Sequence, residues 1–374
     1  MITHSKTYEI TVLTPLFICS DLRDKLTEID FFLENGKIVV IDFDKLLSLT
    51  KNNERLLDEI LLGLEGSVAS FDLKRILQKY QIKVEQCKRY AMNFRGTFPS
   101  GTRKEIACFV KTAGKVYIPG SSLKGAIRSF ITKALQKKFI ALYDNEIARV
   151  KTNDKISDAG VERQVFGDPY ASVFKYLQIS DSNPISPENL EVFEVKILNI
   201  CNGRAKWYAK PQNVENPKDA LSNFVEGLPS KMSVTGSIKI DPQFVEKLKE
   251  KVEVQVDDPV KFLAKLINHA AKHYIENEMN FYKKYGIYEI ADLYQKILDN
   301  MPKLRENEFI LQVGFSTGYL SKTVGMLLKP DSLKRVAEIA YRNAKPELFP
   351  KTRRIVFNNG KILAIPGWIR VKIM

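Results

Sequence analysis

The sequence is poor in the side chains that bind transition metals or form disulfides. Its 374 residues include only four cysteines and three histidines. No cysteine pair has CxxC or metal-ligand spacing, so we expect reduced thiols, as in a cytoplasmic protein. His269 and His273 stand four residues apart, but the segment between them lacks the glutamate of an HExxH motif. We therefore expect no metal site and no other cofactor.

Long apolar runs are also absent. No run approaches the ~20 residues that a helix needs to span a bilayer. Residues 1–17 lack the basic and then apolar layout of a signal peptide. The sequence therefore predicts a soluble, cytoplasmic protein that does not contact a membrane.

Acidic residues are the third shortage. Lysine and arginine together number 58, against 44 aspartates and glutamates, which gives a net charge of +14. Such an excess favours a polyanionic partner, of which nucleic acid is the commonest. A basic enzyme with a solvated surface would show the same balance, so charge alone leaves both interpretations open.

Strand-like and helix-like segments follow one another without the even rhythm of βαβ units. Strand patterns include residues 7–18 and 174–181, and Asn358-Asn359-Gly360 predicts the turn of a C-terminal hairpin. Helical patterns cover about 44–90, 121–143 and 259–301, and a polar segment at about 201–231 is expected to be a mobile loop or a hairpin. This order favours an α+β fold with antiparallel sheets and sizeable helical and loop insertions.

One stretch, "VYIPGSSLKGAIRS" at residues 116–129, combines a strand end, a glycine turn and a helix start. Gly120 allows the turn, and Ser121 or Ser122 is placed to cap the helix. Lys124 and Arg128 share one flank near the positive end of the helix dipole, so the segment can bind an anion. Gly125 costs roughly 1 kcal/mol relative to alanine inside a helix, which suggests that another backbone approaches it closely.

The segment does not match a nucleotide-binding P-loop. In GxxxxGK[ST], the lysine and hydroxyl follow the second glycine, whereas Lys124 precedes Gly125 and Ala126 follows it. A capped helix without a ligand remains the alternative.

A second strand, glycine turn and helix recur at 309–328, which is what a repeated domain would produce.

The segment "YIPGSSLKGAIRS" resembles the glycine-rich signature of the RAMP superfamily of CRISPR proteins. Two further segments, "ITVLTPLFICS" and "VFGDPYASVFKYLQISDS", resemble the opening strand and the FGD segment of that family, and "VGFSTGYLSKT" resembles the C-terminal glycine-rich loop of one subunit type. Together these segments resemble the fifth subunit of type III-A (Csm) effector complexes. The resemblance implies two ferredoxin-like (RRM-like) RAMP domains. These would be residues 1–185, with the signature at 118–128, and 186–374, with a glycine-rich loop at 314–323.

The resemblance also implies a function. Such a subunit binds the backbone of the guide RNA, caps the 3′-end side of the interference complex, and supports guide maturation and assembly in antiviral defence. Its expected partners are guide (CRISPR) RNA, the neighbouring RAMP backbone subunits of the Csm complex and host nucleases that trim the guide. It is not credited with cutting RNA, so no catalytic residue is expected.

Binding any guide requires contacts to phosphates and ribose hydroxyls, and not to base edges. The expected RNA-binding residues carry cations, hydroxyls or a close-approach glycine, and Trp207 could stack on a base. They are Gly120, Ser121, Ser122, Lys124, Gly125, Arg128, Gly314, Gly318, Lys322, Arg95, Arg353, Arg354 and Trp207. For the basic C-terminal residues the alternative is a solvated face, and for Trp207 it is a hydrophobic anchor.

The alternative function is a RAMP-family endoribonuclease acting on guide precursor or target RNA. The repeating subunits of these complexes use an aspartate located between the first strand and the signature. Asp30 is the candidate for that role here, or else one of the histidines. Scarce histidine and the lack of a carboxylate cluster favour the non-catalytic interpretation.

Overall fold

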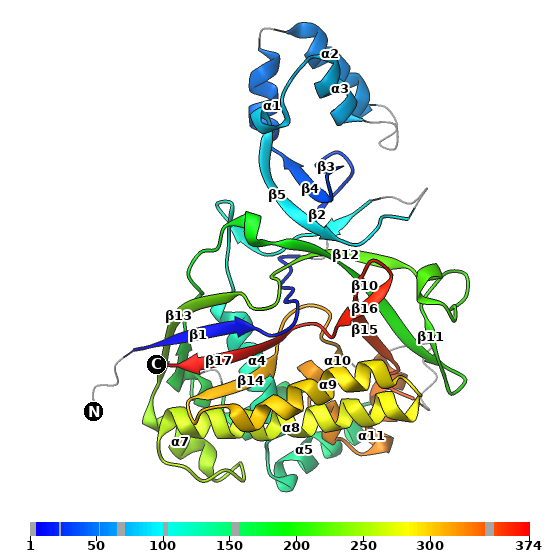
Figure 1. Ribbon diagram of the computed structural model, residues 1–374. Coiled ribbons are helices and arrows are strands. Elements are labelled where there is room, and N and C mark those ends of the chain that lie inside the picture. Colours follow the sequence, from blue (N-terminus) through cyan, green and yellow to red (C-terminus); the bar gives the residue numbers. More distant parts are fainter. Residues whose placement is uncertain are drawn as a thin grey trace.

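The fold is that of a computed structural model (Figure 1). It describes residues 5–21, 24–51, 53–65, 72–99, 104–151, 157–168, 170–340 and 348–374. Helices and strands are mixed along the chain and form two large sheets and one small hairpin, β7 (Lys111–Thr112) with β8 (Lys115–Val116). The expected α+β class is therefore confirmed. None of the described helices is both long enough and apolar enough to cross a bilayer.

A five-stranded antiparallel sheet has the order β14-β17-β1-β13-β9. Its strands are β1 (Lys6–Val12), β9 (Leu177–Ile179), β13 (Ser233–Ile240), β14 (Glu308–Gln312) and β17 (Trp368–Ile373). In β1 the side chains of Tyr8, Ile10 and Val12 are buried, and the alternating residues are not. This period of two places one face of the sheet against the core.

Two helices, α4 (Gly120–Lys133) and α8 (Pro259–Lys284), pack against this sheet. The Phe130 ring of α4 lies 6.1 Å from the Tyr274 ring of α8 and 6.4 Å from the Trp368 ring of β17. Asn268 of α8 also covers the edge strand β14, because its amide donates to the Glu308 carbonyl at 2.9 Å. Helix α8 thus satisfies backbone groups that an open sheet edge would leave unpaired.

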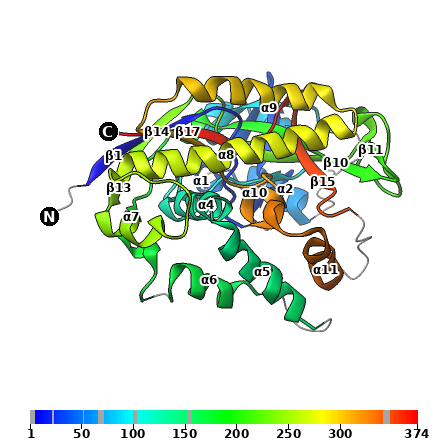
Figure 2. The same cartoon turned by 90° about the horizontal axis from the view of Figure 1, so that it is seen from below.

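The remaining helices of the main body surround this layer. They are α5 (Lys137–Arg149), α6 (Ala159–Phe166), α7 (Pro242–Lys249), α9 (Tyr288–Asn300), α10 (Tyr319–Lys322) and α11 (Pro330–Ala340). Figure 2 shows α8 and α9 running side by side. The break expected near Gly286 is present, and this glycine has a positive φ of 71°. The helix expected over 121–143 is instead divided between α4 and α5.

The second sheet has ten strands, and the long buried strand β10 (Glu191–Cys201) lies at its centre. The others are β2 (Lys25–Leu26), β3 (Phe31–Glu34), β4 (Lys37–Ile41), β5 (Lys88–Arg95), β6 (Ile106–Ala107), β11 (Arg204–Trp207), β12 (Ser222–Gly227), β15 (Thr352–Asn358) and β16 (Lys361–Ala364). Strands β11 and β12 lie within 201–231, and β11 forms a hairpin with β10, so the segment matches the hairpin alternative and is not a continuous loop. The β15–β16 hairpin turns at Asn359-Gly360 with two positive φ angles, as predicted.

The segment in which a helical insertion is expected contains three helices, α1 (Phe43–Thr50), α2 (Glu54–Glu65) and α3 (Leu73–Lys79). With β3, β4 and the start of β5 they form a lobe that projects from the main body (Figure 1). The lobe has its own apolar cluster, which includes Leu46, Leu56, Ile60 and Leu77. This separate apolar cluster gives the lobe a small hydrophobic core of its own beside the main sheet.

Both large sheets contain strands from before and after residue 185. Strand β1 is hydrogen-bonded between β13 and β17, and β5 pairs with β10 in parallel. The division into 1–185 and 186–374 therefore stays a prediction, and neither large sheet is confined to one of these halves.

Candidate nucleic-acid interface

The turn at Gly120, in the glycine-rich signature, packs against the end of β9 and the residues that follow it. A side chain at Gly120 would come closer than 3.0 Å to the carbonyl oxygens of Ile179 and Ser180, so only glycine fits there. The Gly120 N–H donates to the Asp181 carboxylate at 2.8 Å. Asp181 therefore satisfies the first free N–H of α4, and neither Ser121 nor Ser122 caps this helix. That part of the prediction is wrong.

Ser182 fixes the same turn from the other side. Its hydroxyl accepts from the Ile118 N–H at 2.9 Å, and its N–H donates to the Ile118 carbonyl at 2.9 Å. Sequence reasoning did not name Asp181 or Ser182 as site residues. The signal was present, since both lie in the "SDS" of the segment that resembles the RAMP pattern.

The second glycine-rich segment, residues 314–323, lies against the chain that follows β1. Gly314 has a φ of 97°, and a side chain there would overlap the Phe17 carbonyl oxygen. That oxygen accepts from the Phe315 N–H at 2.6 Å. Gly318 has a φ of 89° and starts α10. Two positive φ angles and one close backbone contact explain why glycine occupies these positions.

The two glycine-rich segments meet across one cavity of about 1410 Å³. We call this candidate RNA-binding cavity the RNA groove. It is lined by residues 18–21, one face of α4, residues 312–319 and 321–323, and residues 348–352 with Arg354. It brings together six of the predicted residues: Ser122, Gly125, Gly314, Gly318, Lys322 and Arg354. Helices α4 and α10 are joined at its floor, because Ser129 Oγ and Lys133 Nζ both donate to the Ser321 carbonyl at 2.8 Å.

The cations of the RNA groove have no carboxylate partner among the described residues. Lys322 and Arg354 are exposed to the cavity and close enough to repel each other. Partial burial and the charge of Arg354 lower the pKa of Lys322. The buried hydroxyls of Ser316 and Ser321 also lack a hydrogen-bond partner within the described ranges. Unpaired cations and hydroxyls of this kind fit the oxygens of a phosphate.

The outer flank of α4 faces an adjoining cavity of about 990 Å³, which shares Gly125 and Lys322 with the RNA groove. Lys124 lies there without an acidic partner in the described part of the chain, and burial lowers its pKa. Arg128 differs, because it forms an ion pair with Glu162 of α6 and lies 5.5 Å from the Phe174 ring. A phosphate at Arg128 would have to compete with that carboxylate. Ser121 is exposed at the start of the helix.

Gly125 lies on the open side of α4. A methyl group at this position would meet nothing within 4 Å. No part of the described chain therefore explains the glycine, although it weakens the helix. This loss of helix stability is consistent with the close approach of another molecule to α4 at Gly125.

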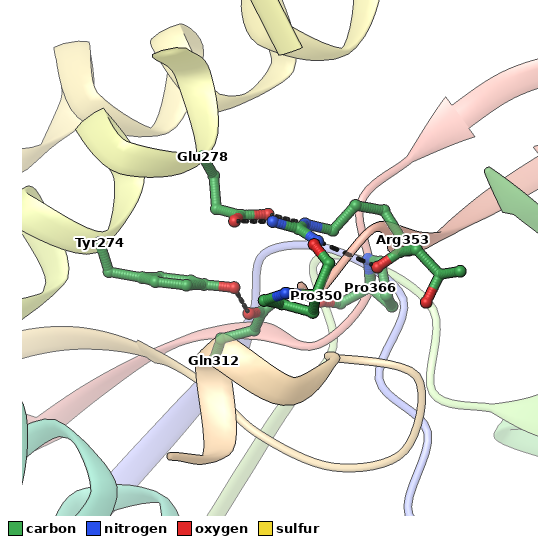
Figure 3. A network of polar contacts seen from close by, with 7 residues as sticks. Tyr274, Glu278, Gln312, Pro350, Arg353 and Pro366 are labelled. Atoms are coloured by element: carbon green, nitrogen blue, oxygen red, sulfur yellow. Dashed lines mark hydrogen bonds and ion pairs between the residues drawn. The ribbon is translucent and has the colours of Figure 1, made fainter. Parts of the chain in front are cut away.

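Arg353 points toward Glu278 of α8 (Figure 3) and is not among the residues that line the RNA groove, which corrects the prediction for this residue. It is 8% exposed, and its Nε and Nη2 donate to the Glu278 carboxylate at 2.6 and 2.8 Å. Burial alone would lower the pKa of Arg353, but Glu278 outweighs burial and raises it. The guanidinium also donates to the Pro350 carbonyl at 3.0 Å and lies 4.0 Å from the Phe281 ring. Arg353 thus anchors β15 to α8.

Arg95 and Trp207 also have internal partners. Arg95 pairs with Glu191 at 2.8 Å, which joins β5 to β10, and it lines a different cavity. Trp207 is 7% exposed, and its ring lies edge-on to Phe357 at 5.1 Å. It cannot stack on a base from that position, so the hydrophobic-anchor interpretation applies and the RNA-stacking prediction is corrected.

Asp30 belongs to a turn. Its carboxylate accepts from the Thr27 N–H at 2.7 Å and from the Thr27 hydroxyl at 2.8 Å, and it does not line the RNA groove. His269 and His273 lie on the exposed side of α8 with their rings 4.6 Å apart. Across the described residues, no three His, Cys, Asp or Glu side chains gather to hold a metal ion. His4 lies outside the described residues.

The model of the RAMP superfamily matches residues 9–321. A "CRISPR system Cms protein Csm5" of Methanocaldococcus jannaschii is 25% identical over 97% of this chain and 88% of its own. A protein of the same description from Streptococcus thermophilus is 26% identical over 50% of this chain and 54% of its own.

Two solved structures agree over nearly the whole length. One is a chain of a Csm-crRNA-target RNA ternary complex of a type III-A CRISPR-Cas system, with a TM-score of 0.68, 20% identity, and coverage of 99% of this chain and 100% of that chain. The other is the crystal structure of T. onnurineus Csm5, with a TM-score of 0.65, 20% identity, and coverage of 96% and 99%. The chain therefore belongs to the RAMP superfamily, and the members that it resembles from end to end are Csm5 proteins of type III-A CRISPR systems.

Proposed function

We propose that this protein is a non-catalytic subunit of a type III-A CRISPR interference complex. It binds the backbone of the guide RNA, caps the 3′-end side of the complex, and supports guide maturation and assembly in antiviral defence in the cytoplasm. The observation that carries the proposal is the meeting of two separately predicted glycine-rich segments across one groove with unpaired cations. The neighbouring RAMP subunits are its expected protein partners, and recruitment of a host trimming nuclease stays a prediction.

The chemistry of the RNA groove suits a nucleic-acid backbone. Lys322 and Arg354 offer charge, and Ser122 offers a hydroxyl, all on the wall of one cavity. An open helix face at Gly125 lets a bulky strand come close. Because phosphate contacts carry no sequence information, such a groove would accept any guide.

We also propose that the five-stranded sheet and its helices form a ferredoxin-like RAMP unit. The order β1, α4, β9, β13, α8, β17 follows the strand–helix–strand–strand–helix–strand plan of that fold. In space β9, β13, β1 and β17 are consecutive neighbours, with β14 added outside β17. The second ferredoxin-like unit implied by the family resemblance would have to lie within the ten-stranded sheet.

The proposal is tested by titrating end-labelled single-stranded RNA against the protein at several salt concentrations. In the variant Lys322→Ala/Arg354→Ala we expect weaker binding. The slope of log K against log salt concentration should become shallower by about 1.4, since each lost phosphate contact removes about 0.7 from that slope for single strands. The control is Lys272→Ala/Lys283→Ala, which removes two exposed lysines of α8 outside the groove. Equal losses in both variants would show general attraction by a basic surface and contradict the groove. The same two variants are also compared in the assembled complex, because the RNA groove could require a neighbouring subunit in order to bind RNA.

The endoribonuclease alternative is tested with Asp30→Ala in the assembled complex. The Asp30 carboxylate is held by Thr27, so we expect unchanged RNA fragments. Disappearance of one specific cut, with the complex still assembled, would assign catalysis to Asp30 and refute the non-catalytic proposal.

A further inference from the structure

A second cavity, of about 1000 Å³, lies between α9, the end of β1 and the β15–β16 hairpin. It shares no lining residue with the RNA groove. Its walls are largely apolar, with contributions from Pro15, Leu293, Ile297, Met301, Leu304 and Ile365. Leu363 stands on the β16 side of this cavity and is 39% exposed, so an apolar anchor is open to solvent there. We call this cavity the α9 groove.

Five cations line these apolar walls. Arg95 is paired with Glu191, and the other four are Lys231, Lys296, Lys303 and Arg370. Lys231 and Lys296 are exposed and have no acidic partner among the residues that the structure describes. Within the described ranges, Lys303 donates only to the neutral amide oxygen of Asn300, at 2.9 Å. The α9 groove therefore has positive charge that the described chain does not neutralise.

Arg370 is the cation of this groove that most clearly lacks a hydrogen-bond acceptor among the described residues. It is half-buried on β17 and donates to the Thr11 hydroxyl at 3.3 Å. Its Nε atom is buried without any hydrogen-bond partner in the described ranges. The one carboxylate on the wall, Glu191, is already bound by Arg95 at 2.8 Å and by Asn93 at 3.2 Å. A buried unpaired donor on a cation costs stability unless a ligand supplies an acceptor.

We propose that the α9 groove docks a segment of a neighbouring protein subunit that carries apolar side chains flanked by aspartate or glutamate. An apolar centre with a charged rim is the usual anatomy of a protein interface. Carboxylates at the rim would neutralise Lys231, Lys296 and Lys303, and one could reach Arg370. This inference deepens the assembly role and rests on that part of the proposed function.

Single-stranded RNA suits the α9 groove less well. Sequence-independent RNA grooves use aromatic rings on which bases stack. Phe193 is the single aromatic residue in the described lining, and it is 2% exposed. Phosphates would also lie against leucine, isoleucine and proline surface, where they lose hydration without gaining partners.

The test is photo-cross-linking in the assembled effector complex. The photoreactive residue p-benzoylphenylalanine replaces Leu363, and the cross-linked products are identified by mass spectrometry. The same residue in place of Leu221, which is 41% exposed and outside both grooves, gives the background. We expect a cross-link from position 363, above that background, to an acidic and apolar segment of another subunit.

Charge reversal shows whether the cations select this partner. Lys296→Glu should reduce the yield from position 363 several-fold, whereas the matched change Lys284→Glu on α8 should leave it unchanged. A cross-link to RNA, no cross-link above background, or equal effects of the two charge reversals would each overturn the proposal. RNA titration of the same variants reports on the RNA groove separately, so failure of the docking inference and failure of the RNA function are distinguishable.

Discussion

Two glycines of the same helix should respond in opposite ways to alanine. Gly125 lies inside α4 with nothing within 4 Å of an added Cβ, so Gly125→Ala should raise the free energy of unfolding by about 1 kcal/mol through helix propensity. Gly120 begins the helix, where an added Cβ would overlap the carbonyl oxygens of Ile179 and Ser180. Gly120→Ala should therefore lower the free energy of unfolding by about 1–3 kcal/mol, as overpacked sites do.

Urea denaturation of the two variants beside the wild type measures both changes. A destabilised Gly125→Ala protein would refute the open helix face. A neutral Gly120→Ala change would show that the end of β9 does not lie against the turn. The same Gly125→Ala protein tests function, since its methyl group enters the RNA groove. More stable protein with weaker RNA binding is the expected combination.

Three further predictions concern buried groups. Arg353→Ala should cost about 3–5 kcal/mol in urea denaturation because Glu278 is left buried and unpaired, whereas Arg354→Ala should change stability little and weaken RNA binding. Burial lowers the pKa of Lys133 to about 7, so the unfolded chain binds the extra proton between about pH 7 and 10.5 and stability rises with pH there. Lys133→Met should remove that rise, by up to about 1.4 kcal/mol per pH unit, and equal slopes in both proteins would contradict it. Trp207→Ala should cost about 3–5 kcal/mol, and loss of RNA binding without loss of stability would restore the stacking role.

The sequence predicted the helices and turns well where they depend on the conformational preferences of neighbouring residues. The interruption at Gly286, the turn at Asn359-Gly360 and the mostly helical character of residues 45–80 all follow from propensity, and the structure has them. The stretch at 201–231 left a loop and a hairpin both open because its polar residues and prolines mark turns, while β11 and β12 are stabilised by pairing with β10. Strand pairing between distant segments carries little local signal.

What the sequence by itself determined is the chemistry available: an excess of cations, two glycine turns that lead into helices, and no set of metal ligands. Tertiary structure decided which of those groups meet. Arg353 and Arg354 are adjacent and identical in type, yet alternation along β15 turns one toward Glu278 and the other into the RNA groove. That choice depends on which face of β15 packs against α8, and no local pattern encodes it. The groove itself exists because strands from both ends of the chain share one sheet, which places residues 120–129 beside residues 314–323.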